Sequence, residues 1–203
     1  MRNWVLQYMR KFKAWLLYVV RKREYISYHI SDAVIKPLRV TPKCMELEEN
    51  VSIFKGARIE GVYQYNEKHF SPRIVFKKGV HIQQNLHLTC ANYIEIGENT
   101  AIAANVTITD IHHPYTDISK PIERNDIEVS KVIIGNDCKL YNNCVILPGT
   151  TIGKHVTIGA NSVVSGVIPD YCVVVGCPSR IIKKYDDRTG AWRKTDKNGI
   201  FLI

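Results

Sequence analysis

Two adjacent histidines, His112 and His113, are preceded by Asp110 and followed by Pro114. Histidine is the natural general base near neutral pH, because its unperturbed pKa is about 6.5. A carboxylate three residues before His113 is able to fix the tautomer of the imidazole and stabilise its charged form, and it is equally able to cap a turn where a loop begins. Taken alone, a pair of histidines on a loop is a solvated surface feature, so the surrounding chain decides its meaning.

The chain that must position these residues is organised in steps of six. In residues 132–164 an aliphatic side chain returns at every sixth position, and a small or β-branched residue stands four positions after each of the first five. The aliphatic positions are Ile134, Leu140, Ile146, Ile152, Ile158 and Val164. A period of six fits neither an α-helix, near 3.6, nor an alternating strand. It is typical of a parallel β-helix, in which three hexapeptides form a triangular coil and successive coils pair as parallel strands about 4.8 Å apart.

The same period covers most of the chain, with two interruptions. It occurs at Leu47, Ile53 and Ile59, at Phe76, Ile82 and Leu88 and, after an offset of two residues, at Ile96, Ile102 and Ile108. A polar insertion interrupts it at about 64–73, and segment 109–131, which contains both histidines, interrupts it again. A loop of about 20 residues in a compact repeat is usually functional or disordered. We therefore expect an N-terminal segment over 1–46, a β-helix over 47–184 with a catalytic loop at 109–131, and a C-terminal tail over 185–203.

The N-terminal segment is strongly basic. Residues 1–24 account for +6 of the formal net charge of +9. Residues 3–23 are predicted to form an amphipathic helix, which either packs on the β-helix or lies on an anionic membrane surface. A second short helix is expected to begin at Ser31 or Asp32 and to end before Pro37.

Composition limits the remaining functional classes. No apolar run approaches the roughly 18 residues of a membrane span, and no signal peptide or nucleic-acid-binding motif is evident. The six cysteines form no C-x-x-C pair, and Cys138 and Cys144 fall in the small-residue column of the repeats. We expect small buried thiols in a reducing cytosol rather than zinc ligands or disulfides.

These repeats resemble those of the hexapeptide-repeat acyltransferases, which have a left-handed parallel β-helix. The loop resembles that of the sugar O-acetyltransferases, which include galactoside and maltose acetyltransferases and enzymes that decorate bacterial surface polysaccharides. In those enzymes the catalytic histidine precedes a proline at the same distance after the stretch I-G-x-N…I-A-x-N-V-T, here residues 96–107. The surface-polysaccharide branch has T-D-x-x-H, which matches 109–113. Both alignments select His113 over His112 as the base.

The resemblance also implies the reaction and its setting. It predicts direct, acetyl-CoA-dependent acetyl transfer to a sugar hydroxyl in bacterial surface polysaccharide biosynthesis, with no metal ion. Such a transfer needs a base for the hydroxyl proton, donors for the oxyanion and aligned substrates. The family's members assemble as homotrimers with sites between subunits. We expect a cytoplasmic location, and the basic residues 1–24 either make a peripheral contact with the inner face of the cytoplasmic membrane or pack on the protein itself.

Residues for both substrates follow from the same resemblance. Asn85 lies in N-L-H-L-T, where galactoside enzymes have N-F-N-L-T, and would hold the acceptor hydroxyl. Asn142 and Ala160 would line the pantetheine groove, with the Asn142 amide facing the thioester oxygen. Arg180 and Lys183 would meet the nucleotide phosphates. The family often has W-I-G at 139–141, where this chain has K-L-Y, so one aromatic contact with coenzyme A is missing.

Three other functions remain open on sequence grounds. One is an N-acetyltransferase that acts on an amino sugar or a nucleotide sugar. The second is a zinc enzyme like the γ-type carbonic anhydrases, but the adjacent histidines of the loop cannot easily reach one metal together with His81 or His87. The third is a non-catalytic scaffold that docks to a membrane or a synthase through its basic helix. Metal analysis and an acetyl-CoA binding assay would separate them.

Overall fold

The computed structural model describes residues 12, 20, 33–34, 37–196 and 199–202. The helix expected over 3–23 lies outside the described residues except for Phe12 and Val20, and so does the start of the second short helix. Within the described residues, no helix is long and apolar enough to cross a membrane.

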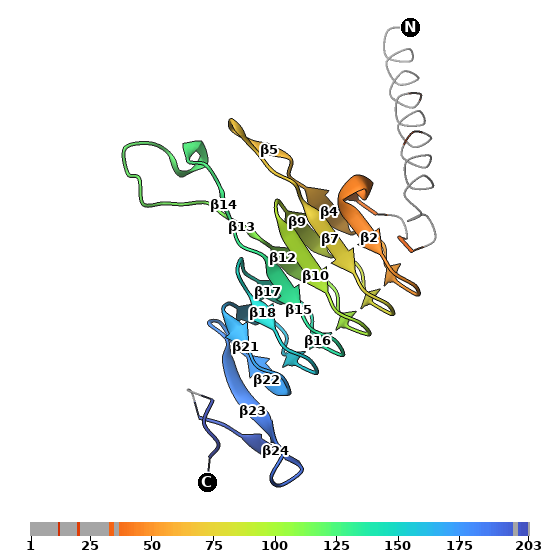
Figure 1. Cartoon of the computed structure of the whole chain (residues 1–203), viewed down its shortest axis with the longest axis vertical. Helices are drawn as coiled ribbons and strands as arrows, with labels where there is room; N and C mark the ends of the chain where they lie inside the picture. Colours follow the sequence, from red (N-terminus) through yellow and green to blue (C-terminus); the bar gives the residue numbers. More distant parts are fainter. Residues whose placement is uncertain (1–11, 13–19, 21–32, 35–36, 197–198, 203) are drawn as a thin grey trace, which may run out of the picture.

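Three parallel sheets form the body of the molecule (Figure 1). Sheet 1 contains β1 (Arg39–Val40), β4 (Arg58–Gly61), β9 (His87–Cys90), β12 (Thr107–Thr109), β17 (Val145–Ile146) and β20 (Val163–Val164). Sheet 2 contains β2 (Met45–Leu47), β7 (Arg73–Phe76), β10 (Tyr93–Ile96), β15 (Val132–Ile134), β18 (Thr151–Ile152) and β21 (Val167–Ile168). Sheet 3 contains β3 (Ser52–Ile53), β8 (His81–Ile82), β11 (Ala101–Ile102), β16 (Lys139–Leu140), β19 (Thr157–Ile158), β22 (Cys172–Val175), β23 (Arg180–Asp186) and β24 (Ala191–Lys194).

Each coil runs from sheet 2 through sheet 3 to sheet 1 and then enters the next coil. Two of the three corners matter for function. We call the turns from sheet 3 to sheet 1, which contain Asn85, Asn105, Asn143 and Asn161, the asparagine corner. We call the turns from sheet 1 to sheet 2, which include 91–92 and the segment 110–131, the loop corner.

The core consists of the aliphatic columns that the period of six predicts. In sheet 3, Ile102 is paired with Leu140 and Leu140 with Ile158, and all three side chains are fully buried. The same holds in sheet 2, where Ile96 is paired with Ile134 and Ile134 with Ile152. Each coil therefore buries its apolar side chains against the coils above and below it, and the expected parallel β-helix is confirmed.

Glycine follows the aliphatic residue of sheet 2 where neighbouring coils come closest. A Cβ atom on Gly97 would lie 2.4 Å from the carbonyl carbon of Gly135, and one on Gly135 would lie 2.5 Å from the oxygen of Gly153. No larger residue fits these positions without moving a backbone, which explains the repeated I-G pair.

Both ends of the β-helix differ from the expected boundaries. β1 pairs with β4 in sheet 1, and the short 3-10 helix η1 (Pro42–Cys44) connects it to β2, so the first coil begins before residue 47. At the other end β23 turns back on β22, and β24 pairs antiparallel with β23. The tail thus extends sheet 3, a placement that the sequence does not indicate.

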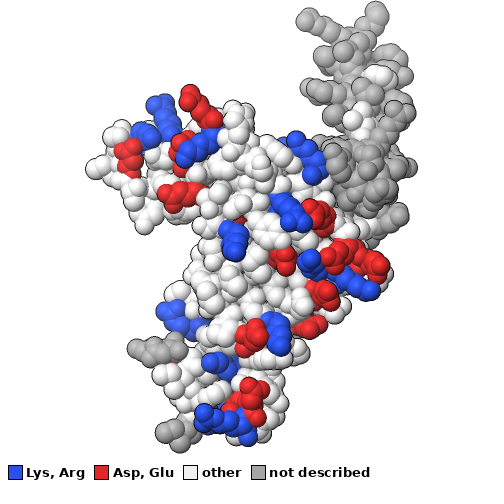
Figure 2. Space-filling view, viewed as in Figure 1, with Lys and Arg blue, Asp and Glu red and all other residues white. Residues whose placement is uncertain are grey.

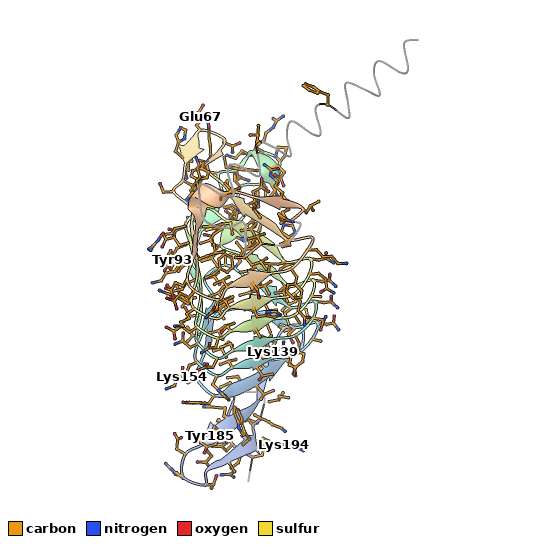
Figure 3. The ribbon with its side chains drawn as sticks, turned by 90° about the vertical axis from the view of Figure 1, so that its right-hand side faces the viewer. Glu67, Tyr93, Lys139, Lys154, Tyr185 and Lys194 are labelled. Atoms are coloured by element: carbon orange, nitrogen blue, oxygen red, sulfur yellow. The ribbon has the colours of Figure 1, made fainter. Side chains whose placement is uncertain are left out.

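Two excursions leave the β-helix at the loop corner and project on one side (Figure 1). The first is the hairpin of β5 (Gln64–Tyr65) and β6 (Lys68–His69), with Glu67 at its tip (Figure 3). The second has an antiparallel stem of β13 (Ile111–His112) and β14 (Glu128–Val129), and carries η2 (Ile122–Arg124). The tight turn at 91–92 joins β9 to β10 in the coil between them.

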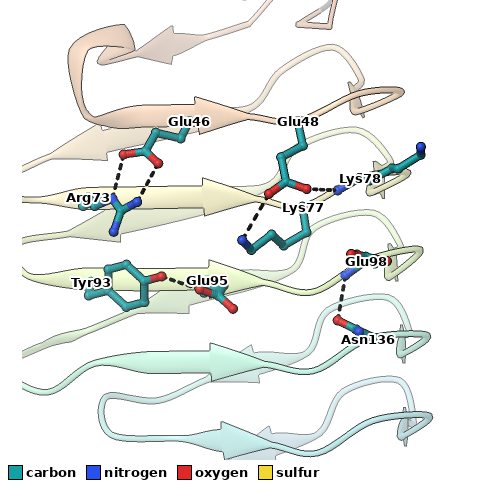
Figure 4. Close-up of polar contacts among 9 residues, drawn as sticks. All are labelled: Glu46, Glu48, Arg73, Lys77, Lys78, Tyr93, Glu95, Glu98 and Asn136. Atoms are coloured by element: carbon teal, nitrogen blue, oxygen red, sulfur yellow. Dashed lines mark hydrogen bonds and ion pairs between the residues drawn. The ribbon is translucent and has the colours of Figure 1, made fainter.

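Hydrogen-bonded polar pairs cover part of the outer face of sheet 2 (Figure 4). Arg73 donates to both carboxylate oxygens of Glu46, at 2.6 and 2.7 Å. On the neighbouring strand β10, Tyr93 donates its hydroxyl proton to Glu95, two residues further along the same strand. Arg73 and Glu46 are exposed and Tyr93 and Glu95 are half-buried, so we expect solvent to screen the ion pair and leave it little weight in stability.

Burial of the cysteines gives a direct test of this fold. Five of the six cysteines are buried and Cys177 is exposed, and burial raises the pKa of the Cys44 thiol to about 11. Because the thiolate is the reactive form, we expect a disulfide reagent to label one thiol rapidly in the folded protein and six after unfolding. The Cys177→Ser variant should lose the rapid phase. Rapid labelling of several thiols in the folded chain would contradict the packing.

Candidate active site

Asp110 lies at the loop corner, fully buried, where β12 leads into the loop. Its Oδ1 accepts the backbone N–H of Ala91 at 2.8 Å, and its Oδ2 accepts those of Asn92 and Tyr93 at 2.7 and 2.9 Å. The carboxylate therefore satisfies the amides of the tight turn in the preceding coil. Of the two roles that the sequence leaves open, this is the structural one, and Asp110 does not hydrogen bond to His113 in this structure.

The base of the loop is closed by further contacts. The backbone N–H of Ser130 donates to the carbonyl of Asp110 at 2.9 Å, and the buried Asn125 donates its side-chain amide to the carbonyl of Pro114 at 3.2 Å. Ile127, which also belongs to the loop, is buried and lines a pocket between the loop and sheet 1. In Figure 2 the loop overhangs the body as a lobe, with side chains of both charges near its tip.

The two histidines of the loop have different surroundings. His112 is exposed, and its ring lies beside that of Tyr115. His113 is half-buried and lines a pocket of about 410 Å³ between the loop and sheet 1. Its Nδ1 is buried without a hydrogen-bond partner in the part of the chain that the structure describes. Of the two imidazoles, that of His113 is the one placed to meet a molecule in the pocket.

Polar side chains of sheet 1 form the floor of this pocket. Thr89 and Thr109 stand on adjacent rungs, and their hydroxyls are 2.9 Å apart. The Thr109 hydroxyl also accepts the backbone N–H of Ile111, which joins the floor to the loop. Tyr65 of the hairpin forms part of the wall. The full lining is Arg58, Glu60, Val62, Tyr65, Thr89, Thr107, Thr109, Ile111, His113 and Ile127.

Charged side chains cluster at one side of the pocket floor. The Glu60 carboxylate, mostly buried, lies between Arg58 and Arg39, at 2.5 and 2.9 Å. His87 occupies the rung between Arg58 and Thr107. Burial and then the positive charge of Arg58 lower the pKa of His87, so that it is mainly neutral at pH 7. A row of hydroxyls beside a paired acid and base suits a polyhydroxylated ligand.

Asn85 lies at the asparagine corner, at the opposite end of β9 from the loop. Its φ is +62°, and its side-chain amide donates to Asn105 at 3.0 Å. Asn105 donates to Asn143, and Asn143 to Asn161, so that one chain of amide hydrogen bonds follows the corner across four coils. Asn85 is thus part of a structural ladder, and any role toward the acceptor is additional.

Of the four residues expected to contact coenzyme A, Asn142, Ala160 and Arg180 lie at or next to the same corner, and Lys183 does not. Asn142 and Ala160 are exposed, in turns one coil apart, and the carbonyl of Asn142 accepts the N–H of Asn161. Arg180 begins β23 where the chain leaves the last turn of this corner, and it lines a second pocket of about 240 Å³. Lys183 is exposed opposite Val173, further along sheet 3.

One chain therefore separates the expected site residues into two groups. Asn85, Asn142 and Ala160 follow the asparagine corner, whereas His113 lies at the loop corner, across the width of sheet 1. A strand such as β9, with four residues, spans about 13 Å at 3.3 Å per residue.

Several residues at the pocket were not expected from the sequence. In the sequence, Tyr65 lies in the polar insertion, whereas Arg58 and Glu60 lie in the repeats. Only the alternation of polar and apolar residues along 58–60 indicates that this strand has a polar face. Within the described residues, no group of three or more His, Cys, Asp or Glu side chains could hold a metal ion.

Replacement of Asp110 tests its structural role. In Asp110→Asn one oxygen becomes an N–H₂ group that faces backbone donors, so we expect the free energy of unfolding to fall by about 2–4 kcal/mol, as for lost hydrogen bonds to a charged group. Asp117→Asn, an exposed position in the same loop, should leave the unfolding midpoint nearly unchanged. Urea unfolding measures both variants, and equal midpoints would contradict the anchoring role.

Comparison with known proteins agrees with this architecture. Residues 131–166 match the model described as bacterial transferase hexapeptide (six repeats). The chain is 39% identical over 128 residues to the putative lipopolysaccharide biosynthesis O-acetyl transferase WbbJ of Escherichia coli, covering 60% of this chain and 65% of that protein. It is 34% identical over 129 residues to the galactoside O-acetyltransferase of Escherichia coli, covering 58% and 61%. The chain thus spans less than two thirds of the length of each of these relatives.

A solved structure supports the same conclusion. The crystal structure of a maltose O-acetyltransferase from Clostridium difficile superposes with a TM-score of 0.51 at 36% identity, covering 56% of this chain and 60% of that one. Residues 131–166 are therefore bacterial transferase hexapeptides, and the chain has a left-handed parallel β-helix like that of the hexapeptide-repeat acetyltransferases.

Proposed function

We propose that this chain transfers an acetyl group from acetyl-CoA to a hydroxyl of a sugar in a bacterial surface polysaccharide, with His113 as general base. The observation that carries the proposal is the half-buried imidazole of His113 above a floor of threonine hydroxyls. The names of the similar proteins, a putative lipopolysaccharide biosynthesis O-acetyl transferase, a galactoside O-acetyltransferase and a maltose O-acetyltransferase, support the same reaction class.

The steps follow from the chemistry of a thioester. A nitrogen of the His113 imidazole takes the proton of the acceptor hydroxyl as its oxygen attacks the thioester carbonyl. The negative charge that develops on the carbonyl oxygen needs a fixed donor, for which we propose the backbone amide of Asn142. The C–S bond then breaks, the ester remains on the acceptor, and the thiolate of coenzyme A takes the proton from the imidazolium. Arg180 and Lys183 would hold the nucleotide phosphates.

The geometry of one chain supports a site shared between copies. His113 and the group at the asparagine corner lie at opposite ends of the strands of sheet 1, so a single chain does not bring them together. In a cyclic trimer, the loop corner of one copy would meet the asparagine corner of the next. We propose this arrangement, in which Asn85 and Asn142 of one copy face His113 of its neighbour.

A peripheral membrane contact through residues 1–24 stays a prediction. The prediction is based on the net charge of +6 of these residues and on the apolar face of the helix expected there. Salt-sensitive sedimentation with anionic vesicles, compared with a chain that begins at Ser31, would test it.

The reaction itself is tested by thiol release from acetyl-CoA with a panel of acceptors. The panel should include neutral sugars, oligosaccharides and amino sugars, because preferred acetylation of an amine would indicate an N-acetyltransferase instead. In His113→Ala we expect kcat to fall by about 10²–10⁴, the range for the loss of a general base. His112→Ala, at an exposed position, should be much milder. Parent-like turnover in the His113 variant would remove the residue from the mechanism.

Complementation tests the shared site. Asn85→Gly removes the side chain and keeps the left-handed backbone, so it should lower activity without strain. Mixed equally with His113→Ala and reassembled at random, about a quarter of the sites in cyclic trimers would combine both intact residues. Activity should then return to about that fraction of the parent value. Continued inactivity in mixed trimers confirmed by mass spectrometry would place both residues within one chain, or remove Asn85 from the site.

A further inference from the structure

The hairpin of β5 and β6 is docked on the loop that carries His113. The hydroxyl of Tyr65 donates to the Glu123 side chain at 2.8 Å and lies 2.9 Å from the carbonyl oxygen of the same residue. Asn66 donates to the carbonyl of Asn125 at 3.3 Å, and Lys68 forms an ion pair with Asp126 at 3.4 Å. Two excursions that leave different coils are thereby joined through residues about 60 apart in sequence.

Tyr65 is the residue of the hairpin that reaches the imidazole. The rings of Tyr65 and His113 have centroids 5.4 Å apart and lie nearly perpendicular, at 79°, which is a favourable geometry for two aromatic rings. Both side chains line the same pocket. The hydrogen bond to Glu123 fixes the far end of the Tyr65 side chain and raises its pKa, so the hydroxyl remains a donor at neutral pH.

Hydrogen bonding does not orient this imidazole within the described residues. Nδ1 of His113 has no partner, and the nearby carboxylate of Asp110 is occupied by backbone amides. A general base must nevertheless be held in a productive direction, because a displacement of about 1 Å costs as much as 10²-fold in rate. The packed ring of Tyr65 is the contact that supplies this constraint.

We propose that Tyr65 is a positioning residue for His113, acting through the packing of its ring, and that it forms part of the wall of the acceptor pocket. This inference rests on the proposed function and adds to it. Tyr65 acts through the base and takes no part in proton transfer. Its removal should therefore affect turnover of the acceptor and leave the binding of acetyl-CoA, assigned to the asparagine corner, unchanged.

Four variants separate ring packing from mere attachment of the loop. Tyr65→Leu removes the ring and the hydroxyl, whereas Tyr65→Phe keeps the ring and loses the bonds to Glu123. Asn66→Gly weakens the docking without touching the ring and keeps the positive φ of +51°. Tyr93→Phe is the matched control, because it deletes another tyrosine–glutamate hydrogen bond, on the outer face of sheet 2 (Figure 4).

We expect these variants to differ in kcat, as measured by steady-state kinetics, and not in the KM for acetyl-CoA. We expect kcat to fall about 10–100-fold in Tyr65→Leu and about threefold or less in Tyr65→Phe, Asn66→Gly and Tyr93→Phe. The KM for acetyl-CoA should stay within about twofold throughout. Parent-like kcat in Tyr65→Leu would overturn the proposal. So would an equal loss in Asn66→Gly, because that result would assign the effect to docking alone.

A second measurement does not depend on activity. The C–H resonances of the His113 ring, assigned by their absence in His113→Ala, should move in Tyr65→Leu through loss of the tyrosine ring current and stay in place in Tyr93→Phe. If the chain transfers no acetyl group to any acceptor, the proposed function fails while this shift still reports the contact. Unchanged His113 resonances in Tyr65→Leu would overturn the positioning role whatever the reaction proves to be.

Discussion

The structure depends on the stacking of aliphatic columns between coils. Ile102, Leu140 and Ile158 are fully buried only because each coil lies in register on the next. Extra residues within a strand would shift a whole row of side chains from the core to solvent. An insertion can therefore leave and return only at a corner. Both excursions of this chain use the corner between sheet 1 and sheet 2, with one tight turn between them, and so they meet above the same face of sheet 1.

That corner determines the site. The buried carboxylate of Asp110 binds the amides of the tight turn below and fixes where the loop begins, and Asn125 closes the loop above it. The hairpin then joins the loop through Tyr65 and Lys68. His113 is held over the hydroxyls of sheet 1 as a consequence of backbone anchoring and ring packing. Among the residues that the structure describes, no carboxylate is hydrogen-bonded to Nδ1 of His113.

Sequence reasoning predicts the repetitive part of this molecule well, because burial enforces the period. The columns through Ile134, the offset before Ile96 and the limits of the long loop all follow from spacing. It predicts contacts between excursions poorly. Tyr65 and Glu123 lie 58 residues apart in segments without periodicity, so no pattern relates them. The asparagine ladder is an intermediate case: its members sit at repeat positions, but only their hydrogen bonds show that Asn85 is a structural residue.

The most direct test of the account is a crystal structure of the chain with coenzyme A and a sugar acceptor. We expect the thiol to enter the pocket between the loop and sheet 1, with an acceptor hydroxyl about 3 Å from a nitrogen of the His113 imidazole. We also expect the pantetheine to follow the corner of Asn142 and Ala160 on a neighbouring copy. A thiol bound away from His113 of every copy would contradict the central claim.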